Sequence, residues 1–286
     1  MKLLLYFVCV SAFLLNATTA AVASESWEQD LIAGETAWKN GEYEKAERHF
    51  RSVEEEAIRQ DYGPLVSYSR HLATYVAEEK TGEYESSSRL DFTFPHLVID
   101  NGFYAGARTA LERAVERQEQ NAPPSLLMPL LALGRTYQHE GDLQTAEMQF
   151  ERAIAIFEEL DYTTQVFNGW IVLLLSGDFY RDTERFTKAE DYYQRALPLV
   201  AEVNTTKGTA YGYVLMRLAE NDFYQERYDE AEAHLLQATS IFMTNSATTA
   251  HAHSLQWQAE IARVRGLQDK ADDLDKQAAK LLSPAE

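Results

Sequence analysis

The sequence predicts an all-α fold, a solenoid built from antiparallel helical hairpins. In a run from Leu130 to Ala153, apolar and small residues recur at helical spacing and are interrupted once, at Gly141, which is typical of two packed helices joined by a turn. The run returns downstream, between residues 173 and 196 and again between 215 and 238. A repeated hairpin fixes the architecture and favours binding over chemistry.

A period near forty residues follows from the small residues expected at the close contact of each second helix. These residues are Ala46, Ala107, Ala146, Ala189, Ala231 and Ala271. Their successive separations are 61, 39, 43, 42 and 40 residues. We therefore expect residues 24–286 to form a single solenoid domain of about six hairpins. The long first step predicts a non-repeat insertion at residues 81–102.

The first hairpin spans residues 27–59 with a turn at Asn40–Gly41, and the second has helices near residues 65–76 and 104–118. The insertion lies between those last two helices, and Pro95 forbids a continuous helix through it. It is too apolar for a flexible loop, and its apolar side chains are Leu90, Phe92, Phe94, Leu97, Val98 and Ile99. We expect it to fold against the solenoid. Three roles stay open: capping a groove, occupying it, or covering an exposed edge, of which the last is favoured.

The later hairpins carry their own start and stop signals. Ser125 follows two prolines and is a good N-cap for the third hairpin. In the fourth hairpin, Pro198 falls within the second helix and predicts a kink or an early end. The last hairpin, residues 253–282, is more polar than the others, as the terminus of a solenoid requires.

The N-terminus has the pattern of a secretory signal peptide. Lys2 is followed by an uncharged apolar run of 13 residues, and Ala21 and Ala23 then have Ala-x-Ala spacing. We interpret residues 1–23 as cleaved rather than as an anchor helix, because the run is too short to span a bilayer. The single cysteine, Cys9, lies inside this segment. The chain is therefore expected to be exported, preferably to a periplasm and otherwise secreted, without disulfides.

The charge limits the class of partner. The formal net charge of −19 argues against nucleic acid, whose phosphates are bound by clustered Lys and Arg. It also disfavours anionic membrane surfaces, and we expect no stable membrane insertion after signal cleavage. Among protein partners, it favours those with basic character.

Catalytic and metal signatures are missing from the sequence. It holds no Gly-rich phosphate loop, no Gly-x-Ser-x-Gly elbow and no His-Glu-x-x-His motif, and its seven histidines are scattered. We therefore expect no catalytic residue, no metal and no cofactor, and predict that the chain is not an enzyme. Only a deep polar pocket beside the insertion, lined by His71 or His96 with a carboxylate, would favour an enzyme.

The repeat resembles that of the tetratricopeptide repeat (TPR) family, W-x2-L-G-x2-Y followed by a Gly, a Tyr and then A-x3-F-x2-A. The third hairpin matches nearly throughout, with Leu130, Leu133, Gly134, Tyr137, Gly141, Ala146, Phe150 and Ala153. The period near forty is longer than the family's commonest length of about 34 residues and is similar to its long-helix members. The resemblance implies a right-handed superhelical solenoid.

The residues themselves explain this pattern. Gly134 and Gly177 are expected to let the paired helix approach closely, and Gly141 to supply the positive φ that ends a first helix.

The resemblance also implies that the first helices line a concave groove that binds a peptide or a partner protein. The side chains favoured for binding are Trp38, Arg135, His139, Arg181, Tyr213, Phe223 and Tyr224. Aromatic and Arg side chains of this kind are enriched at interaction hot spots.

The leading hypothesis is an exported, non-enzymatic protein–protein interaction scaffold. One alternative is a structural or assembly protein that acts through self-association of the repeats, and the oligomeric state is left open. A small enzyme with a site near the insertion is less favoured.

Overall fold

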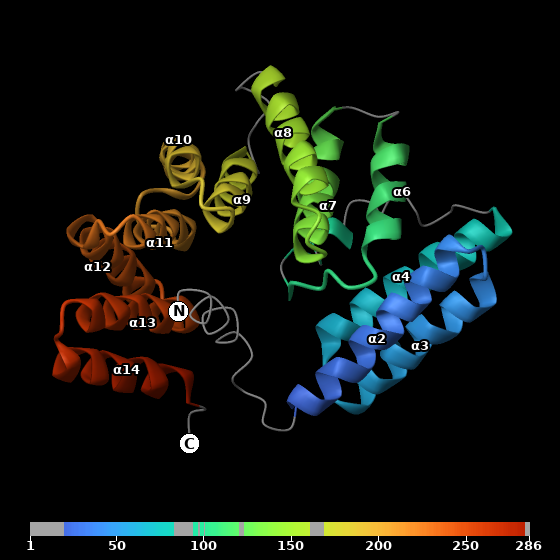
Figure 1. The fold of residues 1–286 in the computed structure, drawn as a ribbon, viewed down its shortest axis with the longest axis horizontal. Coiled ribbons are helices and arrows are strands. Elements are labelled where there is room, and N and C mark those ends of the chain that lie inside the picture. Colours follow the sequence, from blue (N-terminus) through green and yellow to red (C-terminus); the bar gives the residue numbers. More distant parts are fainter. Residues whose placement is uncertain are drawn as a thin grey trace. The chain divides into compact units, whose positions relative to one another are not determined.

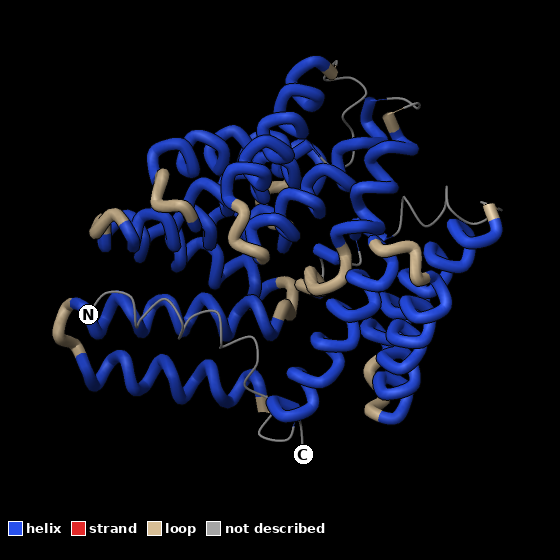
Figure 2. Tube along the Cα trace, turned by 45° about the vertical axis from the view of Figure 1, so that its right-hand side comes forward, coloured by secondary structure: helices blue, strands red, loops and turns tan. Residues whose placement is uncertain are grey.

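The computed structural model describes residues 20–82, 94–96, 98–99, 101–119, 123–160 and 169–283. These residues form helices joined by short loops, without a β-strand among them (Figures 1 and 2). The all-α repeat fold predicted from the sequence is confirmed. Residues 1–19, most of the predicted signal peptide, lie outside the described residues. The chain divides into two compact units, unit 1 (residues 1–149) and unit 2 (residues 150–286).

The helices follow one another in pairs. Unit 1 contains α2 (Ala20–Lys39), α3 (Tyr43–Arg59), α4 (Gly63–Thr81), α6 (Arg108–Gln118), the 3₁₀ turn η2 (Pro123–Leu126), α7 (Leu127–His139) and the start of α8 (Leu143–Glu159). Unit 2 contains the rest of α8, then α9 (Gly169–Asp182), α10 (Phe186–Asn204), α11 (Thr209–Tyr224), α12 (Tyr228–Thr244), α13 (Thr248–Val264) and α14 (Gln268–Leu282). The odd-numbered helices α9, α11 and α13 are the first helices of the three complete hairpins in unit 2.

Small residues hold the paired helices close together. All six alanines predicted at the close contacts are fully buried. A Cβ added to Gly177 would lie 2.5 Å from the Tyr193 ring, and one added to Gly34 would lie 2.6 Å from the Phe50 ring. Real Cβ atoms are not found at such distances, so these glycines are required where a ring of the second helix packs onto the first. The predicted role of Gly177 is confirmed.

The turns within the hairpins use a left-handed residue after the first helix. Gly141 has a φ of 85°, as predicted, and Gly41 has a φ of 74°. The first two hairpins of unit 2 use Glu184 and Glu226 instead, with φ of 60° and 62°, while the last keeps a glycine, Gly266, with a φ of 75°. A residue with a Cβ is strained in this region, so the turns at Glu184 and Glu226 keep the geometry at a cost in stability.

Pro198 does not end its helix. α10 continues through Pro198 to Asn204, so the predicted early end is wrong, while the alternative of a kink stays a prediction. Ala196 and Val200, on either side of the proline, are fully buried. Core packing on both sides can offset the hydrogen bond that proline removes.

The described part of the insertion folds onto α4. Phe94 and Val98 are fully buried, and the Phe94 ring lies 5.4 Å from that of Tyr68 and 5.6 Å from that of Tyr75. The expectation that the insertion folds against the solenoid is confirmed for these residues, which cover a face of α4. Leu90, Phe92 and Leu97 lie outside the described residues.

The helix after the insertion begins later than predicted. α6 starts at Arg108 rather than at Tyr104, because Gly106 has a φ of 75°. A Cβ on Gly106 would lie 2.9 Å from the Leu31 carbonyl oxygen of α2. The turn therefore brings the chain against α2 before the helix can start.

We expect Gly177→Ala to lower the free energy of unfolding by about 1–3 kcal/mol, because the new methyl group would displace the Tyr193 ring. Urea unfolding followed by circular dichroism measures the loss. The matched control is Gly63→Ala, since nothing lies within 4 Å of a Cβ placed there. Equal stability of the two variants would contradict the close-contact role of Gly177.

We expect Glu184→Gly to raise the stability of the chain by about 1 kcal/mol, because glycine adopts the left-handed conformation without strain. Glu184→Ala is the control, since alanine keeps the Cβ and therefore the strain. Thermal unfolding compares the two variants. A midpoint temperature for the glycine variant no higher than that of the alanine variant would contradict backbone strain at Glu184.

Candidate functional site

The structure divides the seven predicted binding residues between the two units. Trp38 lies in the core of unit 1 with only 3% of its surface exposed. Its ring packs against Phe50 and Tyr75, and its indole Nε1 donates a hydrogen bond to Glu79 Oε2 at 2.9 Å. Trp38 therefore has little surface to offer to a partner.

Arg135 and His139 lie on α7 in unit 1. Arg135 is half-buried and its Nη1 donates to Gln138 Oε1 at 2.9 Å. His139 is exposed, with its ring 5.5 Å from that of Tyr104. Neither observation tests binding, and both residues stay predictions.

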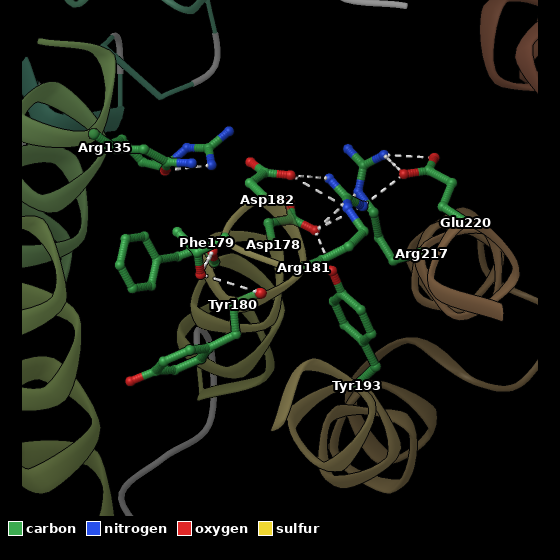
Figure 3. A network of polar contacts seen from close by, with 11 residues as sticks. Arg135, Asp178, Phe179, Tyr180, Arg181, Asp182, Tyr193, Arg217 and Glu220 are labelled. Carbon is green, nitrogen blue, oxygen red and sulfur yellow. Dashed lines mark hydrogen bonds and ion pairs between the residues drawn. The ribbon is translucent and has the colours of Figure 1, made fainter. Parts of the chain in front are cut away.

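Arg181 lies at the centre of a buried ion-pair network in unit 2 (Figure 3). Its side chain on α9 is 11% exposed, and its Nη1 lies 2.6 Å from Glu220 Oε2 on α11. The same nitrogen lies 3.4 Å from Asp178 Oδ1, and Nη2 lies 2.9 Å from Asp182 Oδ1. The network therefore joins two successive first helices.

Arg217 completes the network and was not among the predicted residues. Its Nε lies 3.2 Å from Asp178 Oδ1 and its Nη1 lies 2.8 Å from Glu220 Oε1. The sequence does carry a signal for it. Asp178-x2-Arg181 on α9 is followed 39 residues later by Arg217-x2-Glu220 on α11. One repeat further along the chain, an arginine therefore stands at the position of Asp178 and a glutamate at the position of Arg181.

The surrounding charges keep both arginines protonated. Burial disfavours the charged form of Arg181, but the carboxylates of Glu220, Asp178 and Asp182 outweigh burial and raise its pKa well above the usual value. Burial raises the pKa of the Tyr193 hydroxyl, which donates to Asp178 Oδ1 at 2.8 Å. The network thus holds two guanidinium groups and three carboxylates in fixed positions.

An aromatic cluster lies where α11 ends. It consists of Phe223 and Tyr224 at the end of α11, Phe186 and Tyr228 at the starts of α10 and α12, and Trp257 of α13. The Tyr224 ring stacks on Phe186 at 6.0 Å and meets Trp257 edge-on at 6.0 Å, so the cluster runs across three successive hairpins. Tyr224 is 39% exposed, while Phe223 and Trp257 are half-buried.

One stripe of α11 connects the network to the aromatic cluster. Tyr213, Arg217, Glu220 and Tyr224 are spaced by four, three and four residues and therefore share a helix face. Tyr213 is 40% exposed, and its ring rests 5.2 Å from Phe242. Of the predicted residues, the structure thus brings Arg181, Tyr213, Phe223 and Tyr224 to one region of unit 2.

The described residues hold no group of acids, histidines or cysteines that could bind a metal ion. His71 Nδ1 donates a hydrogen bond to the Ser67 carbonyl oxygen of its own helix, and its ring stacks on Phe94. Within the described ranges, the chain also has no helix both long and apolar enough to cross a membrane. The ion-pair network and the aromatic cluster give unit 2 a surface of charges and rings that are held in place by their neighbours.

We expect Arg181→Met to lower the free energy of unfolding by about 3–5 kcal/mol, because Glu220 and Asp178 would stay buried with less opposing charge. Arg217→Met should cost less, since the Arg217 side chain is 32% exposed. Urea unfolding of both variants checks the order, and equal losses would contradict the central position of Arg181.

Comparisons with known proteins support the repeat assignment. A tetratricopeptide repeat family model matches residues 97–159 and 171–244. BtubC (BKLC) from P. vanneervenii has a similar structure, with a TM-score of 0.58 and 16% identity over 84% of this chain and 90% of that one. No curated protein matches the sequence at a significant level.

Two further solved structures are similar. A putative kinesin light chain from Podosopora anserina with nearly identical TPR-like repeats has a TM-score of 0.54 and 20% identity, over 69% of this chain and 96% of that one. The apo form of RapI has a TM-score of 0.56 and 15% identity, over 91% of this chain and 77% of that one. At these identities the likeness shows the fold alone.

Tetratricopeptide repeat proteins are generally non-enzymatic, and their fold implies a scaffold for protein–protein interaction. The family match, the paired helices and the small residues at their contacts confirm the resemblance to the tetratricopeptide repeat family that the sequence predicts, and the match covers residues 97–159 and 171–244.

Proposed function

We propose that the chain is an exported interaction scaffold that binds a segment of a partner protein across the first helices of unit 2, α9, α11 and α13. The observation that carries the proposal is the stripe on α11. Tyr213 and Tyr224 are 40% and 39% exposed, and both rings rest on buried or half-buried neighbours. Large rings that are held in place yet accessible are typical of interaction hot spots.

The charges of the same surface support a partner with basic character. Arg181 and Arg217 are matched by Asp178, Asp182 and Glu220, which leaves one negative charge in the network. The whole chain has a net charge of −19. A negative surface speeds association with basic partners and disfavours acidic ones.

Export is part of the proposal and depends on the N-terminal sequence. The apolar run and the Ala-x-Ala spacing of residues 1–23 support cleavage and transport to a periplasm or to the medium. N-terminal sequencing of the protein recovered from fractionated cells checks this step, and a chain recovered intact from the cytoplasm would contradict it.

We expect Tyr224→Ala and Tyr213→Ala to weaken capture of the native partner by about tenfold each, the effect of losing a hot-spot ring. Affinity capture with cross-linking identifies the partner, and titration of the purified partner measures the change. Met243→Ala is the matched control, because Met243 on α12 is 60% exposed and lies outside the stripe. Unchanged affinity in both tyrosine variants would contradict the proposal, and light scattering separates it from self-association.

A further inference from the structure

A small polar cavity lies in unit 1, apart from the surface proposed above. Its volume is about 260 Å³, and its walls come from the end of α2, the start of α3, the end of α4 and one side of α6. Pockets for drug-sized ligands usually measure about 300–1,000 Å³. The cavity is therefore of a size for a single side chain or a small amine. Neither His71 nor His96 lines it.

The cavity exists because α6 stands away from α4. Phe94 of the insertion packs against Tyr68 and Tyr75 of α4. α6 reaches α4 through long side chains: Arg113 pairs with Glu79 at 3.2 Å, and the Arg117 guanidinium lies 5.3 Å from the centre of the Tyr75 ring. These long side chains bridge a wider gap between α4 and α6 than the one that small residues leave between the paired helices of a regular hairpin.

The hydrogen-bond donors in the wall are already engaged by carboxylates. Trp38 Nε1 donates to Glu79 Oε2 at 2.9 Å. Arg113 donates from Nη2 to Glu79 Oε1 at 3.2 Å and from Nη1 to Glu116 Oε2 at 3.1 Å. Lys39 Nζ lies 3.3 Å from Glu35 Oε1. The wall therefore has few donors left for an anion.

Carboxylate oxygens are in surplus. Glu112 Oε1 accepts from the Tyr137 hydroxyl at 2.6 Å. Glu112 Oε2 and Glu116 Oε1 have no hydrogen-bond partner among the described residues. Each carboxylate oxygen can accept further bonds. The wall also has three acids, Glu79, Glu112 and Glu116, against Lys39 and Arg113.

Burial is the main cause that raises the pKa of two neighbouring groups, and nearby acids add to it. Beside burial, Arg108 and Lys39 lower the pKa of the Glu140 carboxyl, while Glu35 and Glu112 raise it. Burial and the hydrogen bond to Glu112 raise the pKa of the Tyr137 hydroxyl. The acids of the wall attract a cation and repel a phosphate or carboxylate.

We propose that the cavity binds an amine or guanidinium cation about as large as a lysine side chain, through Glu112 and Glu116 with Glu79 behind them. The cation could belong to a free polyamine or to a basic side chain of a bound protein. Both sources offer the same chemistry, a positively charged group whose N–H donors can bond to the carboxylate oxygens of the cavity wall.

Calorimetric titration of the full chain with spermidine, and separately with the peptide acetyl-Gly-Lys-Gly-amide, tests the proposal. We expect saturable one-to-one binding of at least one probe, and weakening by about tenfold in Glu112→Gln through loss of one close charge. Glu230→Gln on the exposed face of α12 makes the same change in net charge and should leave binding unchanged. Tighter binding of spermidine supports the free amine as the source, and tighter binding of the peptide supports the side chain.

Glu116→Gln keeps the test decisive if Glu112→Gln folds poorly, because Glu116 is exposed and its replacement leaves the Tyr137 contact intact. It should also weaken binding, and the probe should shift the NMR signal of the Trp38 indole N–H. No saturable binding of either probe would overturn the proposal. So would an equal loss in the pocket variants and in Glu230→Gln, which would indicate general attraction to an acidic chain.

Discussion

The close contact between the two helices of a hairpin is the constraint on which the rest of unit 2 depends. Gly177 has no side chain, so the Tyr193 ring can lie against the backbone of α9. The same ring then carries its hydroxyl to Asp178, the residue next to the glycine. The contact that builds the hairpin therefore also fixes one acid of the ion-pair network. Gly34 and Phe50 make the equivalent contact in unit 1, but phenylalanine has no hydroxyl to donate. Glu35, the residue next to that glycine, pairs instead with Lys39 and accepts hydrogen bonds from Thr109.

The network specifies how successive hairpins align more than it stabilises them. Buried ion pairs give little net stability, because desolvation of the charges offsets their attraction. Asp178 and Arg181 meet their opposites, Arg217 and Glu220, only when α9 and α11 are in register. Exposed ion pairs repeat the theme on the second helices, as between Glu158 of α8 and Arg195 of α10. Those pairs are worth less, since water screens them.

The features that the sequence predicts well are those set by neighbours in the chain. Gly141 ends a helix and Gly177 meets its own hairpin partner, so both roles can be derived from spacing alone. The burial of Trp38 is different, because Tyr75 and Glu79 of another helix enclose it. The later start of α6 depends likewise on the approach of Gly106 to Leu31. The position of a residue on a helix predicts the direction of its side chain, but it does not predict which side chains of another helix cover it.

Regular and irregular packing lead to different kinds of surface in the two units. In unit 2 the repeat is kept, so Asp178 and Arg181 meet their opposite charges 39 residues further on. Tyr224 likewise contacts Phe186 and Trp257 from the hairpins on either side. Such a surface suits an extended segment that crosses several helices. In unit 1 the insertion places Phe94 on α4, and α6 must reach α4 through Arg113. Space then remains between the helices, and because polar side chains bridge it, polar atoms line it. A departure from the repeat can in this way turn an open face into a small cavity without changing the fold.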